Sequence, residues 1–309
     1  MTDKFYYLIY GLSVQSDIQL PGAMPCAPTA QPDIISILGK IPAFLKGSRE
    51  SGYGTWTNGF INAWFFTPQA AEFYVEKGKK VIIAPIEHPN WDLVSSLFLS
   101  AAMSLILLQR NEPVFHGSAL EYRGQAFIVS GESGAGKSTV SFELMKDPYG
   151  FLADDTVRVH RVNGTFIAEP SYPQQKICRD MAERLGLQLE KLRYIDEARD
   201  KFAKMCLDRY LPHGLPLKVL VILRKDPEAR QVYSRELKGQ EYLTAMTHAF
   251  YLENTYHDIT GFPAELMMQL IALSSQIQVY AVYRPESGNT IQEVKRAVEQ
   301  LVTGTICAG

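Results

Sequence analysis

The chain has 309 residues, of which 46% are hydrophobic and 21% charged, so its composition is that of a globular protein and excludes a disordered one. The 31 Lys and Arg residues against 33 Asp and Glu residues give a net charge of −2, which argues against broad electrostatic binding to nucleic acid. The four cysteines form no Cys-x-x-Cys pair, and the first residues lack the order of a signal peptide. We therefore expect a reduced, cytoplasmic protein.

Residues 1–110 predict a β-rich region that ends in an apolar helix. The expected strands are residues 5–10, 34–38, 60–67 and 80–84. Residues 93–109 carry no charge and are almost long enough to cross a membrane. Ser96, Ser100 and Ser104 would line one face of this helix, which favours a buried core helix capped near Asn90 or Asp92. We therefore expect no membrane association.

Residues 111–309 show the pattern of an α/β nucleotide-binding domain, and Asn111-Glu112-Pro113 marks its expected boundary. Strands are expected at residues 114–120, 126–130, 150–153, 218–223 and 278–283. Helices are expected at residues 139–146, 181–192, 242–251, 264–275 and 291–301. Asn163-Gly164 is a strong hairpin signal, so residues 157–167 should form a β-hairpin.

Residues 131–138 match the phosphate-binding pattern G-x-x-x-x-G-K-[ST] in full. Glycines let successive backbone N–H groups turn toward phosphate oxygens, Lys137 reaches the β- and γ-phosphates, and the Ser138 hydroxyl can ligate Mg²⁺. The following helix adds its positive N-terminal end. The predicted nucleotide contacts are Gly131, Ser133, Gly134, Ala135, Gly136, Lys137, Ser138 and Thr139.

Asp154 and Asp155 follow an apolar strand, where open α/β sheets place reactive groups. One carboxylate can bind Mg²⁺ while the other takes a proton from an attacking hydroxyl, and their mutual repulsion would raise one pKa. His116 lies on the strand before the loop strand and could pair with an aspartate, although an isolated His in an apolar run is usually structural.

A basic residue should also meet the charge that develops on a transferring phosphoryl group. The candidates are Arg158, Lys176, Arg179, Arg199, Lys201 and Arg284, each of which is more often a surface charge. Residues 171–176 are polar and turn-prone, so they form a candidate substrate or nucleotide loop.

Together, His116-Gly117-Ser118-Ala119, Gly124-Gln125-Ala126, residues 131–138 and Leu152-Ala153-Asp154-Asp155 resemble the catalytic block of the HPr kinase family in order and spacing. This resemblance implies a P-loop kinase core on a mixed sheet with flanking helices, as in phosphoenolpyruvate carboxykinases. It also implies that Asp154 deprotonates a serine hydroxyl, that Asp155, His116 and Lys137 support it, and that Ser138 and Asp155 hold Mg²⁺.

Two features separate the chain from ordinary HPr kinases. Their acidic, glycine-rich signature after the paired aspartates is missing from residues 168–176, where Glu169 is the acidic residue that remains. The opening, Tyr10 to Asp17 followed by Leu20-Pro21, resembles HPr-kinase-like proteins of peptide-tailoring gene clusters, including lasso peptide kinases.

The leading hypothesis is an ATP- and Mg²⁺-dependent kinase that phosphorylates a serine of a peptide, such as a lasso peptide precursor. The second is a bifunctional kinase/phosphorylase of HPr, and the third is a nucleotide-binding regulatory module without phosphoryl transfer. A homo-oligomer is compatible with all three.

Overall fold

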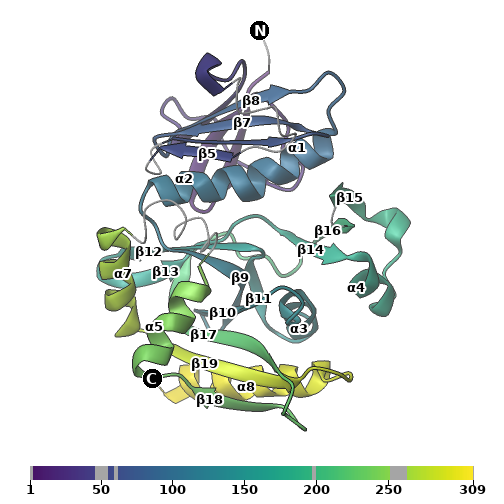
Figure 1. Ribbon diagram of the computed structural model, residues 1–309, viewed down its shortest axis with the longest axis vertical. Helices are drawn as coiled ribbons and strands as arrows, with labels where there is room; N and C mark the ends of the chain where they lie inside the picture. The colour runs from purple at the N-terminus through teal and green to yellow at the C-terminus, as the bar shows by residue number, and fades with distance from the viewer. Residues whose placement is uncertain (1–2, 46–54, 59–61, 197–199, 251–262, 309) are drawn as a thin grey trace. The chain divides into compact units, whose positions relative to one another are not determined.

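The computed structural model describes residues 3–45, 55–58, 62–196, 200–250 and 263–308 (Figure 1). The chain divides into two compact units. The first contains Met1–Glu112 and Ile177–Met205, and the second contains Pro113–Lys176 and the described residues from Cys206 onward. A single boundary near residue 111 does not anticipate that Ile177–Met205 belongs with the first unit.

The first unit contains an eight-stranded sheet of order β3-β1-β2-β4-β8-β7-β6-β5. Its strands are β1 (Phe5–Ile9), β2 (Leu12–Ser16), β3 (Met24–Pro25), β4 (Ile34–Leu38), β5 (Thr55–Asn58), β6 (Asn62–Thr67), β7 (Ala71–Glu76) and β8 (Lys80–Pro85). The strands expected at residues 34–38 and 80–84 are confirmed, whereas β2, β3, β5 and β7 were not predicted. The first strand ends at Ile9 because Tyr10 and Gly11, with φ of 54° and 70°, form a two-residue hairpin turn to β2.

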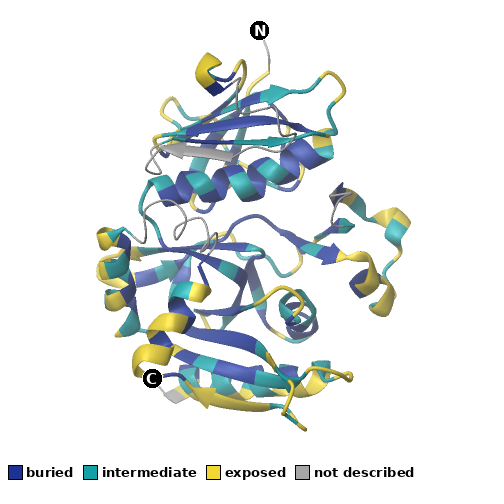
Figure 2. Cartoon of the chain, viewed as in Figure 1, coloured by how far each residue is buried: buried dark blue, intermediate teal, exposed yellow. Residues whose placement is uncertain are grey.

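The apolar segment of this unit is helical from Trp91 to Gln109, as α1 (Trp91–Leu97), a π-helical turn η2 (Phe98–Ala102) and α2 (Met103–Gln109). The Asn90 side chain caps it by accepting from the Leu93 N–H at 3.1 Å. By length and composition this helix is apolar enough to cross a membrane, and 72% of its apolar window is buried within the protein. Figure 2 shows that burial along α1 and α2.

Ile177–Met205 forms most of a small sheet of order β14-β16-β15, made of β14 (Gln174–Cys178), β15 (Arg193–Asp196) and β16 (Lys201–Met205). The single helix expected over residues 181–192 is wrong. Helix α4 (Arg179–Arg184) ends early because Gly186, at φ 65°, donates to the Glu183 carbonyl while Leu187 donates to the Ala182 carbonyl. This pair of bonds is a Schellman motif, which terminates helices. A short 3-10 turn, η3 (Leu189–Lys191), follows.

The second unit is built on a mixed sheet of order β10-β9-β12-β13-β17-β19-β18, to which β11 adds by pairing with β9. Its strands are β9 (Val114–Tyr122), β10 (Gln125–Gly131), β11 (Gly150–Ala153), β12 (Thr156–Val162), β13 (Thr165–Ala168), β17 (Leu215–Asp226), β18 (Tyr233–Glu236) and β19 (Gln278–Pro285). Strands β10, β17 and β19 run parallel to one another. Strand β10 pairs with β9 on one side and with β17 on the other. The strands β10, β9, β12, β13 and β17 therefore form a closed ring of paired strands. The protein is therefore a mixed α/β protein with several sheets.

The core of the second unit lies between this sheet and two helices, α3 (Lys137–Leu144) and α8 (Ile291–Ala308). Phe127, Val129 and Val221 of the sheet meet Val140 of α3 and Val298 of α8, and all five side chains are buried. Helices α5 (Gly239–His248) and α7 (Ala264–Ser274) complete the described part. Helix α5 starts and ends earlier than the helix expected at 242–251, and residue 251 lies outside the described residues.

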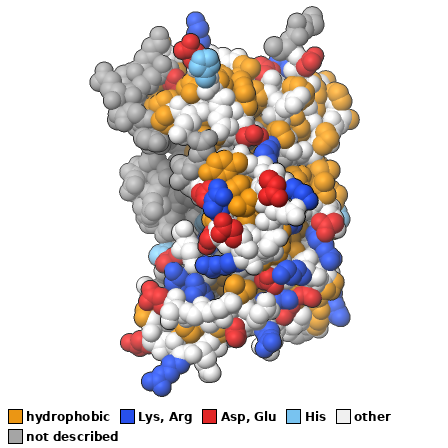
Figure 3. Space-filling model, turned by 90° about the vertical axis from the view of Figure 1, so that its right-hand side faces the viewer, with side chains coloured by type: hydrophobic (Ala, Val, Ile, Leu, Met, Phe, Trp, Pro, Cys, Tyr) orange, Lys and Arg blue, Asp and Glu red, His pale blue; other side chains and the backbone are white. Residues whose placement is uncertain are grey.

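The surfaces of this unit differ along its sheet. Figure 2 shows β10 and β17 largely buried, β19 partly buried and β18 exposed, and every residue of β18 is exposed. On the face drawn in Figure 3, acidic and basic side chains are interspersed. The buried centre of the sheet supplies the strand that carries the phosphate-binding pattern.

Candidate active site

The phosphate-binding pattern forms the turn between β10 and α3, as the sequence predicts. Gly131, Gly134 and Gly136 have φ of 143°, 75° and 106°, which residues with a side chain rarely adopt. A Cβ at Gly131 would lie 2.4 Å from the carbonyl oxygen of Leu223 on the neighbouring strand. The loop therefore has this backbone path because glycine occupies these positions, and α3 begins at Lys137 directly behind it.

Two cationic side chains fix the outer carbonyl groups of the loop. Lys137 Nζ donates to the carbonyls of Gly131, at 2.8 Å, and of Glu132, at 3.1 Å. Arg284 donates from Nε to the Ala135 carbonyl at 3.2 Å and from Nη2 to the Gly134 carbonyl at 3.1 Å. Arg284 belongs to the end of β19, so the parallel strand beside β17 positions it next to the loop.

Asp154 is the buried member of the carboxylate pair, with 4% of its surface exposed. Its Oδ1 accepts from the Ser118 hydroxyl at 2.5 Å, and its Oδ2 accepts from the backbone N–H of Lys176 at 2.9 Å. Burial raises the pKa of the Asp154 carboxyl above its ordinary value. The Ser118 hydrogen bond lowers it, the charge of Asp155 raises it, and Lys176 lowers it. Burial is the largest of these effects, so the net change is a raised pKa.

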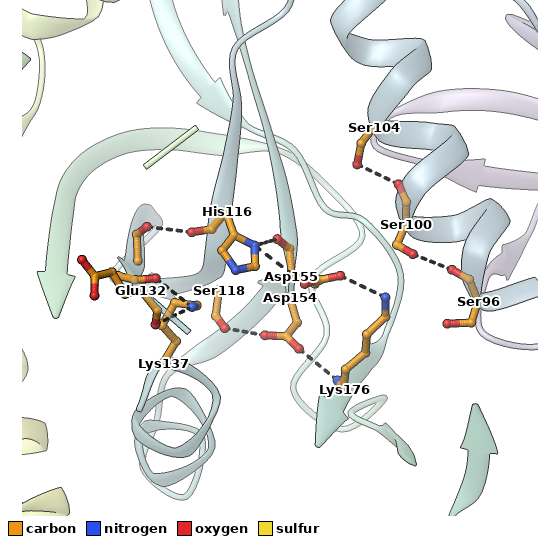
Figure 4. Close-up of polar contacts among 12 residues, drawn as sticks. Ser96, Ser100, Ser104, His116, Ser118, Glu132, Lys137, Asp154, Asp155 and Lys176 are labelled. Atoms are coloured by element: carbon orange, nitrogen blue, oxygen red, sulfur yellow. Dashed lines mark hydrogen bonds and ion pairs between the residues drawn. The ribbon is translucent and has the colours of Figure 1, made fainter. Parts of the chain in front are cut away.

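Asp155 is more accessible, with 19% of its side chain exposed, and Lys176 and His116 contact it. Its Oδ2 pairs with Lys176 Nζ at 2.9 Å, and its backbone carbonyl contacts His116 Nδ1 at 2.9 Å. The same His116 nitrogen lies 3.7 Å from Asp155 Oδ1. The backbone of Asp155 is left-handed, with φ of 71°, a conformation that aspartate tolerates better than most residues. Figure 4 shows these groups turned toward one another.

Strand pairing brings the loop and the carboxylates together. Strand β9 lies between β10 and β12, with Gly117 opposite Ser130 and His116 opposite Thr156. Gly117 lacks a side chain where a Cβ would lie 2.5 Å from the Val129 carbonyl, so the two strands can approach closely. The Ser130 hydroxyl donates to the His116 carbonyl at 2.6 Å. The loop strand and the strand of His116 and Ser118 are therefore immediate neighbours.

The candidate substrate or nucleotide loop at residues 171–176 is largely buried. Ser171, Gln174 and Gln175 are buried, and β14 begins at Gln174. Gln175 Nε2 donates to the carbonyl of Ser138 at 3.1 Å. Lys176, the next residue, reaches both aspartates. The segment therefore connects the first turn of α3 to the carboxylate pair.

The other basic candidates lie in different parts of the chain. Arg284 contacts the loop, whereas Arg158 is buried on β12 near His160, at 3.5 Å. Arg179 pairs with Asp200 in the first unit, which also holds Lys201. Arg199 lies outside the described residues. Sequence reasoning missed Ser118, and the available signal was its position two residues after His116, on the same face of a strand.

The residues present fit a magnesium nucleotide. The glycine-shaped turn and the start of α3 would form the cradle for phosphate oxygens, and Ser138 and Asp155 carry the kind of oxygen atoms that Mg²⁺ prefers. Among the described residues no group of three or more His, Cys, Asp or Glu side chains is arranged to hold a metal ion. Mg²⁺ at nucleotide sites is bound by one or two protein ligands together with phosphates, so such a group is not required.

Comparisons with known proteins find sequence similarity to HPr kinase/phosphorylases. No family model matches the chain. It is 38% identical over 80 residues to an HPr kinase/phosphorylase of Nitrosomonas europaea, covering 26% of this chain and 24% of that protein. It is 26% identical over 188 residues to an HPr kinase/phosphorylase of Cupriavidus metallidurans, covering 60% of this chain and 49% of that protein.

The chain is a distant homologue of the HPr kinase/phosphorylases. It spans between a quarter and a half of the length of these curated relatives. The solved structure of the Hpr(Ser) kinase/phosphatase from Coxiella burnetii also matches, with a TM-score of 0.33 and 12% identity, covering 62% of this chain and 97% of that chain.

Proposed function

We propose that the protein is an ATP-dependent serine kinase whose core is of the HPr kinase type and whose acceptor is a peptide. One observation carries the proposal: the strand of His116 and Ser118 pairs directly with the phosphate-loop strand, and it holds the two aspartates through Ser118 and His116. Distant homology to HPr kinase/phosphorylases supports the same chemistry.

The two carboxylates suit different tasks. Asp154 has a raised pKa, which suits a general base that must accept a proton near neutral pH. Asp155 is the more accessible carboxylate and, with Ser138, would hold Mg²⁺, which neutralises charge on the phosphates when bound. Lys137 and the loop amides would bind the β- and γ-phosphates.

The transfer step balances without a further reactant. The acceptor serine gives its proton to Asp154, and its oxygen forms a bond to the γ-phosphorus. The bond from that phosphorus to the β-phosphate oxygen breaks, so ADP leaves and phosphoserine remains. Since the transition state carries its charge on phosphoryl oxygens, catalysis depends on positioning and on the surrounding cations.

A serine of a peptide precursor, such as a lasso peptide precursor, is the acceptor that we propose. Its support is the resemblance of the opening segment to HPr-kinase-like proteins of peptide-tailoring clusters. Part of that segment has a structural task, because Tyr10 and Gly11 make the β1–β2 turn and Asp17 accepts from the Leu38 N–H at 3.1 Å. The names of the curated relatives favour a second candidate, a kinase/phosphorylase acting on HPr.

The test uses the full chain with ATP, Mg²⁺ and synthetic peptides that end in serine, followed by mass spectrometry. We expect a mass gain of one phosphate on serine. Asp154→Asn should lower the rate by about 10²- to 10⁴-fold while nucleotide still binds, because it removes a general base. Lys137→Met should weaken both nucleotide binding and transfer.

Three outcomes separate the candidates. Phosphopeptide formation that depends on Asp154 supports the peptide kinase. Release of pyrophosphate when orthophosphate and phosphorylated HPr are added supports the kinase/phosphorylase instead. Tight nucleotide binding with no product from any acceptor contradicts both and supports a regulatory module.

A further inference from the structure

Lys176 makes two different contacts to the carboxylate pair. Its backbone N–H donates to Asp154 Oδ2, and its side-chain ammonium pairs with Asp155 Oδ2, each at 2.9 Å. Only 10% of the Lys176 side chain and 19% of the Asp155 side chain are exposed, so water screens this ion pair weakly. Its strength should therefore exceed that of a surface salt bridge.

The lysine is also fixed from its own strand. The preceding residue, Gln175, is buried and donates to the carbonyl of Ser138, the hydroxyl residue behind the phosphate loop. The ammonium of Lys176 is therefore presented to Asp155 by a strand that is tied both to the loop and to Asp154. Figure 4 shows Lys176 on the opposite side of the aspartates from Lys137.

We propose that Lys176 is the resident counter-ion of Asp155 and competes there with the divalent cation of the nucleotide. This inference rests on the proposed function, because it concerns the cation that accompanies ATP. An ammonium and a divalent cation both seek the same carboxylate oxygens, so the lysine weakens cation binding and keeps Asp155 neutralised beforehand. Lys176 is a positioning residue by this account, since it acts through Asp155.

The expected direction follows from what remains when the ammonium is removed. A Lys176 side-chain variant keeps the backbone N–H that holds Asp154, and His116 still contacts the backbone carbonyl of Asp155. Asp155 therefore stays in place and loses only its competing cation. A neighbouring opposite charge changes the proton affinity of a carboxylate by about 1 to 3 log units. We therefore expect a change of about tenfold in divalent-cation affinity, which is the lower end of that range.

The experiment measures binding of AMP-PNP, a non-hydrolysable ATP analogue, by calorimetry at a series of free Mn²⁺ concentrations, without an acceptor. Lys176→Met should lower the Mn²⁺ concentration for half-maximal tightening by about tenfold. Lys176→Arg keeps the charge and should stay within about threefold of the wild type. Lys295→Met is the matched control. The Lys295 side chain is also mostly buried, with 15% of its surface exposed, and it pairs with Asp147 away from the carboxylate pair.

A double-mutant cycle with Asp155→Asn distinguishes competition from general loosening of the site. In the Asp155→Asn background, removal of the lysine should change the Mn²⁺ dependence by less than about twofold, because the contested carboxylate is gone. Equal effects in both backgrounds, or weaker Mn²⁺ binding by Lys176→Met, would overturn the inference while leaving the proposed kinase intact. A wild-type protein that binds neither nucleotide nor Mn²⁺ would overturn both.

Discussion

The phosphate loop and the carboxylate pair belong to the same unit, but they are held in opposite ways. The loop owes its shape to backbone conformations at three glycines, and Glu132, Ser133 and Gly134 are exposed. The pair depends on contacts from distant parts of the chain, the Ser118 hydroxyl and the backbone N–H of Lys176, and Asp154 is buried. Changes in the loop should therefore alter nucleotide binding and local stability, whereas changes around the pair should alter ionisation and its pH dependence.

Gly131→Ala should have the largest effect and tests the loop side of this contrast. The added Cβ would lie 2.4 Å from the Leu223 carbonyl at φ of 143°, so we expect a loss of about 3 kcal/mol in unfolding free energy. Urea denaturation measures it. Gly124→Ala is the control, because Gly124 also has positive φ, 77°, but open space around it, and should cost about 1 kcal/mol. Equal losses of unfolding free energy in the two variants would contradict the close contact between Gly131 and the Leu223 carbonyl.

Asp154→Asn tests burial of the carboxylate through the pH dependence of stability. The folded pKa of Asp154 is raised, so protonated Asp154 stabilises the fold fully below the ordinary value of 3.8, and this contribution is lost as pH rises through the folded pKa. Asparagine does not titrate. The unfolding free energy of the wild type should therefore fall relative to the variant by at most about 1.4 kcal/mol per pH unit in that range. A difference that stays constant from pH 4 to 8 would refute it.

Ser118→Ala removes the hydrogen bond to Asp154 while leaving the carboxylate buried, so it tests the contribution of that hydrogen bond alone. The Ser118 hydroxyl lowers the pKa of Asp154, so its loss should raise that pKa and leave less ionised base in acidic solution. We expect phosphoryl transfer to fall by about tenfold at the low end of the pH profile and to recover as pH rises. Ser141→Ala is the control, because Ser141 is equally buried and its hydroxyl has no hydrogen-bond partner among the described residues. A uniform loss at every pH would indicate a structural role alone.

Arg284→Met should have the smallest effect and returns to the loop. Arg284 donates to the carbonyls of Gly134 and Ala135 from outside the loop, so its removal loosens the backbone without touching Asp154. We expect about fivefold weaker AMP-PNP binding and an unchanged pH profile. Arg224→Met is the comparison, because Arg224 contacts the Tyr283 hydroxyl instead. Equal weakening in both variants would remove the special role of Arg284.

The same contrast explains what could be predicted from the sequence. The loop is contiguous, and the apolar strand before it and the helix after it lie next to it, so a local pattern was sufficient. The Asn163-Gly164 turn is likewise local, and the hairpin of β12 and β13 is confirmed. The Ser118–Asp154 contact spans 36 residues and the Lys176–Asp155 contact spans 21, so neither leaves a local signal.

Two predictions differ from the structure, and each has its own physical reason. The helix expected at 181–192 followed its leucine spacing, but the terminating motif at Gly186 overrode that pattern. The polarity of residues 171–176 predicted a substrate or nucleotide loop, but Gln174 and Gln175 are buried and enter β14. Polarity predicts exposure only where tertiary partners are lacking, and Gln175 has one in the carbonyl of Ser138.

The left-handed backbone at Asp155 has a practical meaning for protein engineering. At φ of 71°, glycine, asparagine and aspartate are the residues that fit with least steric penalty. A saturation library at this position should therefore be enriched in those three whenever folding alone is selected. If selection for catalysis then enriches aspartate over glycine and asparagine, the enrichment measures how much its negative charge contributes, because all three residues fit the backbone conformation.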